Sequence, residues 1–187
     1  MRLTRIALLA GCVALMVACS DKPDSAEPAS SASSQSSPAP ATFVSAVCSA
    51  VSTWQNRMVG AANSFSTDSP KLDVSGRRAR YSRAFDDQKA ITDDLRKDIE
   101  GAPAAGVAEA ESIRTALVAA TGDVQTTLRL NQADAASHPD SDYEFQAVKE
   151  DRLFAGTEKS LSQILKPLDE QSRVHDVPEL GGTCGRT

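Results

Sequence analysis

Apolar residues recur at alternating spacings of three and four through residues 44–65, and this pattern limits the fold more than any other feature. They are Val44, Val47, Val51, Trp54, Met58, Ala61 and Phe65. The spacing keeps them on one side of a helix over three heptads, which is typical of a helix packed lengthwise against others. Thr42 is a suitable N-cap after Pro40, and Pro70 cannot continue the helical hydrogen-bond ladder. The sequence therefore predicts a first long helix that ends near Asp68.

A second helix is predicted from about Ser69 or Ser75 to Ile99. The turn at residues 101–103, with sequence Gly-Ala-Pro, ends it, because its glycine can adopt the left-handed cap conformation. The residues expected on its buried side are Tyr81, Ala84, Phe85, Gln88, Ile91, Leu95 and Ile99.

A third helix is predicted over about residues 106–136, and a fourth begins with a capping box formed by Ser141 and Glu144. The buried side of the fourth helix is expected at Tyr143, Ala147, Glu150, Phe154, Thr157, Leu161, Ile164 and Leu168. The tail over residues 174–187 is expected to be irregular. Four long amphipathic helices joined by short turns predict an all-α, up-down-up-down four-helix bundle over residues 42–187, with both ends at the same pole.

Residues 1–18 have the character of a cleaved bacterial lipoprotein signal. Arg2 and Arg5 precede an apolar run over residues 6–18, which is shorter than the roughly 20 residues of a membrane span. We expect Cys19 to carry diacylglyceryl with a palmitate-type acylation, which supplies the two chains that stable anchoring needs. Cys12 matches the local signal pattern better, but cleavage there leaves a very short apolar run. This predicts a cell-membrane protein, lipid-anchored on the extracytoplasmic side.

The segment over residues 19–41 is rich in Ser, Ala and Pro, and it has too few apolar residues to fold. We therefore expect a lipidated cysteine followed by a disordered tether. Cleavage after residue 18 leaves 18 of the 20 Lys and Arg residues against 25 Asp and Glu residues, a net charge of −7. This charge argues against nucleic acid as a partner.

Cys48 and Cys184 are an even pair in a compartment expected to be oxidising, so they predict one disulfide. The bridge would join the two ends of the folded region. A chain-entropy estimate assigns roughly 5 kcal/mol to a loop of that length, although measured values are often lower. No CxxC or Cys-His spacing favours a metal site instead.

Candidate contact residues lie in the only basic cluster, where Arg78 and Arg80 have no oppositely charged residue one helical turn away. An acidic partner or a wall polymer could bind them, although a solvated helix surface is the more ordinary interpretation. Gln88, Asn131 and Glu150 fall on apolar seams of three helices, which allows either a buried polar network or a register error that leaves them at the surface.

The sequence offers no catalytic grouping that we can name. His138 and His175 fall in predicted loops, and neither has a metal ligand one turn away. Nucleophile elbows and phosphate-binding glycine loops are absent from the sequence. We therefore expect no enzyme activity, no metal and no cofactor.

Several motifs together resemble small uncharacterised lipoproteins of actinobacteria. They are the signal that ends at Cys19, the Ser/Ala/Pro tether, the early Cys48 and Trp54, the turn at 101–103, and the closing Pro-Glu-Leu at 178–180 before Cys184. The resemblance implies a lipid-anchored helical domain and brings no activity with it.

Two functions follow as hypotheses. The first is a non-enzymatic binding or interaction module at the cell envelope, with an envelope protein or wall polymer as partner. The alternative is a carrier that holds a small apolar ligand between its helices. Aromatic residues make up only 4% of the chain, which weighs against haem as the cargo.

Overall fold

The computed structural model describes residues 41–104, 107–144, 146–182 and 184, which form one bundle of helices. The four long helices are α1 (Ala41–Asp68), α2 (Val74–Gly101), α3 (Ala108–Ala136) and α5 (Gln146–Val174). Three helices are short: η1 (Ser69–Lys71), α4 (Ser141–Glu144) and α6 (Pro178–Gly182). No strand occurs in the described ranges, and the predicted all-α class is confirmed. The predicted signal, Cys12, Cys19 and the tether up to residue 40 lie outside the described residues.

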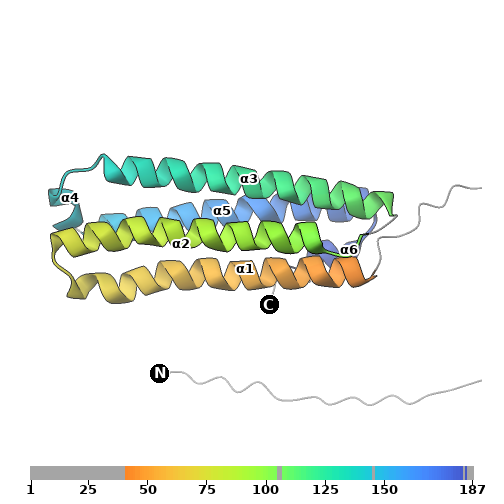
Figure 1. Cartoon of the computed structure of the whole chain (residues 1–187), viewed down its shortest axis with the longest axis horizontal. Helices are drawn as coiled ribbons and strands as arrows, with labels where there is room; N and C mark the ends of the chain where they lie inside the picture. Colours follow the sequence, from red (N-terminus) through yellow and green to blue (C-terminus); the bar gives the residue numbers. More distant parts are fainter. Residues whose placement is uncertain (1–40, 105–106, 145, 183, 185–187) are drawn as a thin grey trace, which may run out of the picture. The chain divides into compact units, whose positions relative to one another are not determined.

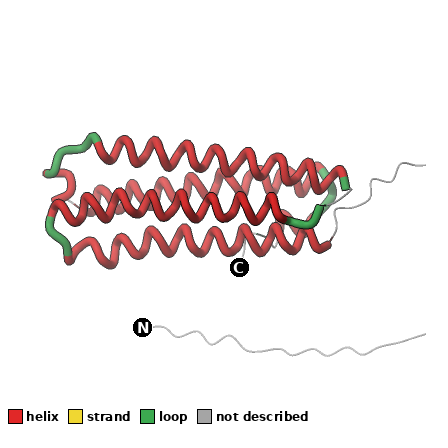
Figure 2. The backbone as a smooth tube through the Cα atoms, in the orientation of Figure 1, coloured by secondary structure: helices red, strands yellow, loops and turns green. Residues whose placement is uncertain are grey.

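The long helices run alternately up and down, as predicted (Figure 1). Helix α1 packs against α2 and α5, and α3 packs against the same two helices, so the four surround a shared core. We call the end where α1 and α3 begin the disulfide pole, and the opposite end the α4 pole. The turns between the long helices lie at these two poles (Figure 2).

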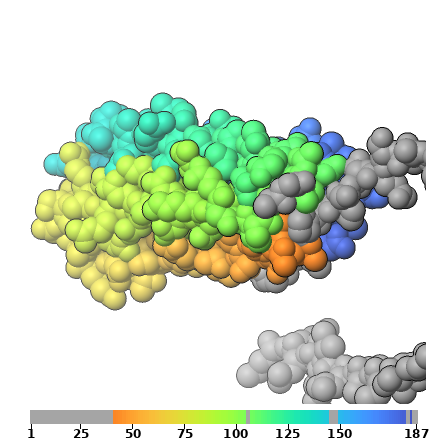
Figure 3. Space-filling model, turned by 45° about the vertical axis from the view of Figure 1, so that its right-hand side comes forward, coloured from red at the N-terminus to blue at the C-terminus, as the bar shows by residue number. Residues whose placement is uncertain are grey.

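The heptad seam of α1 forms the centre of the core. All of its predicted residues except Ala61 are buried, and Ala62 is buried in its place. Trp54 is only 1% exposed, and its indole Nε1 donates to Thr92 Oγ1 on α2 at 3.2 Å. In the space-filling view α2 lies between α1 and α3 (Figure 3).

Helix α2 begins at Val74, within one residue of the predicted start at Ser75 and after the alternative start at Ser69. Its N-cap is Asp73, whose carboxylate accepts from the Gly76 amide at 2.7 Å. At the other end Gly101 remains helical and makes no left-handed cap. Arg114 of α3 takes over that role, because its guanidinium donates to the carbonyl oxygens of Ile99 and Ala102.

The fourth predicted helix is divided into α4 and α5, and α4 begins at Ser141 itself. Thr157, Ile164 and Leu168 are buried as predicted, but over residues 149–160 the buried side of α5 is displaced by about one residue from the rest of the predicted seam. Its fully buried positions include Lys149, Leu153, Gly156, Thr157, Ser160, Ile164 and Leu168. The predicted seam residues Glu150, Phe154 and Leu161 are half-buried instead. The rotation brings a lysine, a glycine and hydroxyl groups against the core.

The C-terminal segment, expected to be irregular, contains helix α6. It turns back at Asp176, whose φ of 51° lies in the left-handed region. The turn is closed by hydrogen bonds in both directions between Ser172 and Val177: the Val177 amide donates to the Ser172 carbonyl, and the Ser172 hydroxyl donates to the Val177 carbonyl. Leu180 is fully buried and fixes α6 on the bundle. This return carries Cys184 to α1, where the structure has it in a disulfide with Cys48, with Cα atoms 4.5 Å apart.

Buried polar side chains connect α1, α2 and α5 inside the core. Gln88, which is 0% exposed, donates from Nε2 to Thr157 Oγ1 at 2.8 Å, and Thr157 donates to the Leu153 carbonyl at 2.9 Å. Thr92, the acceptor for Trp54, donates to the Gln88 carbonyl at 2.8 Å. These contacts fix the register of α2 against its two neighbours.

Replacing Thr157 with valine should lower the free energy of unfolding by about 1.5 kcal/mol, because the buried amide of Gln88 then loses its hydrogen-bond partner. The double variant Gln88→Leu/Thr157→Val should recover most of that loss, because no buried amide remains. Urea unfolding followed by circular dichroism measures both. Strictly additive losses in the double variant would contradict this assignment.

Candidate ligand-binding cleft

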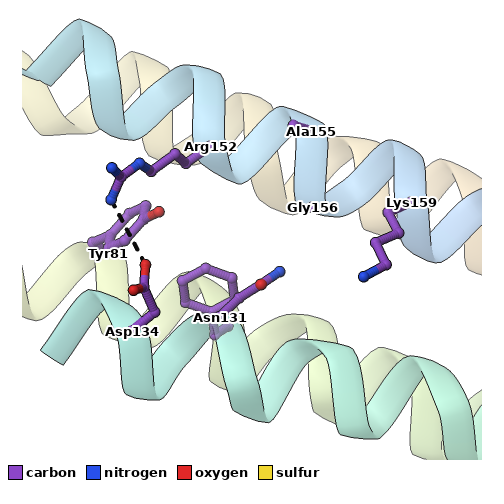
Figure 4. Close-up of a pocket in the computed structure, with 8 residues that line it drawn as sticks. Tyr81, Asn131, Asp134, Arg152, Ala155, Gly156 and Lys159 are labelled. Carbon is purple, nitrogen blue, oxygen red and sulfur yellow. Dashed lines mark ion pairs between the residues drawn. The ribbon is translucent and has the colours of Figure 1, made fainter. Parts of the chain in front are cut away.

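A cleft of about 340 Å³ opens between α2, α3 and α5. Tyr81 and Phe85 come from α2, Asn131 and Asp134 from α3, and Arg152 and Lys159 from α5. Figure 4 shows these helices on the sides of the cleft with polar side chains reaching into it. Gly156 also lines it, so the backbone of α5 forms part of the wall.

One end of the cleft is closed by an ion pair between Arg152 and Asp134, at 3.6 Å (Figure 4). His138 supports this pair from the turn after α3. Its Nδ1 donates to the Asp134 carbonyl at 2.7 Å, and its Nε2 accepts from Arg152 Nη1 at 2.6 Å. The Arg152 guanidinium is therefore held from two sides.

The hydroxyl of Tyr81 reaches the cleft from a buried ring. The side chain is 3% exposed, and its ring packs against Phe65 and Phe85 with centroid separations of 5.3 and 5.1 Å. Burial is the largest of the effects that raise the pKa of Tyr81 to about 12, so the hydroxyl keeps its proton near neutral pH. Within the described ranges this hydroxyl has no hydrogen-bond partner.

Asn131 approaches the backbone of α5 at Gly156. A Cβ atom added at Gly156 would lie 2.8 Å from Asn131 Nδ2, so the glycine leaves room for this amide. Neither the Asn131 side chain nor the ammonium group of Lys159 has a hydrogen-bond or ion-pair partner among the described residues. The two point toward each other across the cleft (Figure 4).

A buried lysine lies beside the cleft, on the core side of α5. Lys149 is 1% exposed, and its Nζ lies 5.0 Å from the ring centroid of Tyr143 and 6.0 Å from that of Tyr81. Asp142 Oδ2 is 3.9 Å away, and no hydrogen bond reaches the ammonium group within the described part of the chain. Burial is the main cause of a lowered pKa of Lys149.

Both arginines that the sequence singled out, Arg78 and Arg80, contact other residues of the bundle. Arg78 pairs with Asp140 at 2.7 Å and lies 5.0 Å from the ring centroid of Tyr143. Arg80 donates to Ser64 Oγ at 2.6 Å and has Asp68 and Asp87 within 4 Å. Neither lines the cleft described above.

The three seam polar residues have separate environments. Gln88 is fully buried and bonded to Thr157, whereas Asn131 and Glu150 are half-buried. The two histidines lie at opposite ends of α5, and only His138 contacts residues of the cleft. No group of three or more metal-ligating side chains occurs in the part of the chain that the structure describes.

Two further clefts do not combine Asn131 and Lys159 in their lining. One of about 310 Å³ lies between α2, α3 and α4 and shares Tyr81. Another of about 380 Å³ lies between α1 and the end of α2, where its cation, Lys97, is 3.8 Å from Asp94. The cleft with Asn131 and Lys159 differs because polar groups that have no partner among the described residues converge on it.

Sequence reasoning did not single out Lys159 or Arg152. It placed Tyr81 and Asn131 on buried seams, which is close to their positions, without assigning their polar atoms to a site. The available signal was Asn131, an amide on an apolar seam, together with a glycine on the facing helix.

No protein-family model, curated protein or solved structure matches this chain. Among the described helices, none has the length and apolar character required to cross a bilayer.

Proposed function

We propose that this protein is a lipid-anchored, non-enzymatic binding module that works outside the cytoplasm and binds through the cleft between α2, α3 and α5. One observation carries the proposal. The Tyr81 hydroxyl, the Asn131 amide and the Lys159 ammonium group face this cleft without a partner in the described chain. These groups are open to solvent in the free protein, and a bound molecule with complementary atoms would replace that solvent.

The surroundings of the cleft favour binding over chemistry. His138 contacts two lining residues, but both of its ring nitrogens are engaged by Asp134 and Arg152. The proposal therefore gives it a positioning role. The remaining groups supply hydrogen bonds, charge and an aromatic floor, which are the ordinary elements of a ligand site.

The proposed location rests on the sequence. A diacylated Cys19 would hold the chain at the membrane, and a disulfide between Cys48 and Cys184 suits an oxidising compartment. The resemblance to actinobacterial lipoproteins supports the same placement. The net charge of −5 for the whole chain argues against nucleic acid as the partner.

Native mass spectrometry of the full mature protein, extracted in detergent from its own membrane, tests this proposal. We expect an N-terminus at Cys19 with diacylglyceryl, and an additional mass retained by the wild type. The variant Asn131→Leu should lose that additional mass. An unacylated N-terminus would overturn the anchor. A retained mass that the variant keeps, or no retained mass in repeated preparations, would overturn the assignment of the cleft.

A further inference from the structure

We infer that the cleft binds a small molecule that carries a carboxylate or a phosphate group, and that Lys159, Tyr81 and Asn131 donate to its oxygen atoms. This inference rests on the proposed function and names the class of ligand. All three side chains line the cleft, and none has an internal partner within the described residues.

Three lining groups with no internal partner in the described chain can donate hydrogen bonds. Lys159 provides an ammonium group, Tyr81 a hydroxyl and Asn131 an amide that can donate two hydrogen bonds. The side-chain acceptors in the lining are the Asn131 carbonyl, the Tyr81 hydroxyl oxygen and the Asp134 carboxylate, and the carboxylate already pairs with Arg152. An oxyanion accepts several hydrogen bonds at once and therefore matches this set.

Charge supports the same class of ligand. The cleft lining has two cations, Arg152 and Lys159, against one anion, Asp134, so its net charge is positive. The chain as a whole carries a net charge of −5. A locally positive cleft on an acidic protein concentrates small anions, whereas the surrounding surface repels large polyanions.

The four cationic and donor residues of the cleft have different roles. Arg152 is already held by Asp134 and His138, so it closes one end and sets the shape of the cleft. Lys159 stands at the other end and is exposed (Figure 4). The Tyr81 hydroxyl is fixed by its buried ring, so it provides direction at little entropic cost. We therefore assign charge recognition to Lys159 and orientation to Tyr81 and Asn131.

The size of the cleft limits the ligand. A volume of about 340 Å³ suits a small organic acid or phosphate ester. The rings of Phe85 and Tyr81 provide an apolar floor for the body of such a molecule.

Titration of the full mature protein in detergent with acetate and, separately, with inorganic phosphate tests the inference by nuclear magnetic resonance. We expect amide shifts around the cleft with a dissociation constant on the order of 1 mM for at least one anion, as suits ligands of so few atoms. Sodium chloride at equal ionic strength is the blank. Comparison of the two titrations shows whether the cleft prefers a carboxylate or a phosphate.

Lys159→Met should weaken binding of the preferred anion about tenfold, because it removes a charge-assisted hydrogen bond. The matched control is Lys166→Met, an exposed lysine two turns further along α5 and outside the cleft lining. It removes the same charge and should leave the dissociation constant within about twofold. Equal weakening by both variants would show a diffuse charge effect and overturn the inference.

Tyr81→Phe and Gly156→Ala separate binding from folding. Tyr81→Phe keeps the buried ring and should weaken binding about fivefold with no loss of thermal stability, because its hydroxyl has no internal partner in the described chain. Gly156→Ala places a Cβ atom 2.8 Å from Asn131 Nδ2 and forces this amide out of its present position, so binding should fall at unchanged or higher stability. Binding that survives in both variants would overturn the assignment.

The inference and the proposed function can fail separately. Absence of saturable binding of either anion overturns the inference, even if the native protein retains a neutral molecule that Asn131→Leu releases. That second result would keep the proposed function and change the class of ligand.

Discussion

Replacing both Cys48 and Cys184 with alanine is expected to lower the free energy of unfolding by about 3 kcal/mol. The two cysteines are 136 residues apart in sequence, so their bond restricts the unfolded chain over nearly the whole domain. The chain-entropy model gives a value near 5 kcal/mol for such a loop, and measured losses for native disulfides are about 2–5 kcal/mol. The substitutions themselves remove little packing, because each deletes a single sulfur atom.

Urea unfolding of the mature chain measures this loss. Cys19 stays unchanged, so both proteins carry the same predicted anchor. We expect the bundle to remain folded, because Leu180 and the paired hydrogen bonds between Ser172 and Val177 still hold α6 against α5. Alkylation of the native wild type should leave Cys48 and Cys184 unmodified. Two reactive thiols and an unchanged unfolding midpoint would contradict the prediction.

Replacing Lys149 with methionine is expected to raise the free energy of unfolding by about 2 kcal/mol near neutral pH. Methionine has a similar length, so it fills the same space between Tyr81 and Tyr143. The lysine must keep its charge at 1% exposure, with Asp142 at 3.9 Å and no hydrogen bond in the described chain. Its contacts with the two rings offset only part of this desolvation cost.

The gain should depend on pH in a defined direction. Burial, together with the nearby Arg152, lowers the pKa of Lys149 below its ordinary value of 10.5, while Asp142 and Asp134 oppose the shift. Between the lowered pKa and 10.5 the unfolded chain binds more protons than the folded one, so wild-type stability rises with pH across this window. The advantage of the methionine variant should therefore be largest below the window and shrink as pH approaches 10.5.

The ionisation of Tyr81 also changes the unfolding free energy at the alkaline end of this pH range. Its pKa is raised to about 12 from 10.0, so its contribution to stability falls as pH rises from 10.0 toward 12. Both proteins contain Tyr81, so most of its effect cancels in the difference between their unfolding free energies, and the comparison is made below pH 10.0. Lys166→Met serves as the charge control and should change stability by less than about 0.5 kcal/mol. A methionine variant less stable than the wild type at neutral pH would show that Lys149 is a net stabilising group.

The sequence predicts the bundle well because its strongest signal is periodic. The α1 seam includes Trp54 and Met58, both large and both buried, and few other arrangements bury such a stripe. Helix ends are harder to predict because they depend on single polar contacts. The sequence left the start of α2 open between Ser69 and Ser75, and the contact of Asp73 with the Gly76 amide decides it; the capping of α2 by Arg114 requires a neighbour from the next helix.

The cleft could not be predicted from the sequence because it depends on a small rotation of α5. A shift of about one residue buries Lys149 and Leu153 in place of Glu150 and Phe154, and the buried Gly156 leaves room for the Asn131 amide. Phe154 and Leu161 fit the apolar period equally well, so periodicity alone favours the wrong register. The packing of α5 against both α1 and α3 determines which of its faces is buried.

The position of the disulfide also constrains how the protein matures. Cys48 lies near the beginning of α1 and Cys184 beyond α6, so the sulfur atoms meet only when α5 lies beside α1. Contacts this distant in sequence form after the local hairpins of neighbouring helices. We therefore expect the disulfide to form last, after the four helices have packed together. Before that stage the two thiols are far apart, so an oxidant cannot join them to each other.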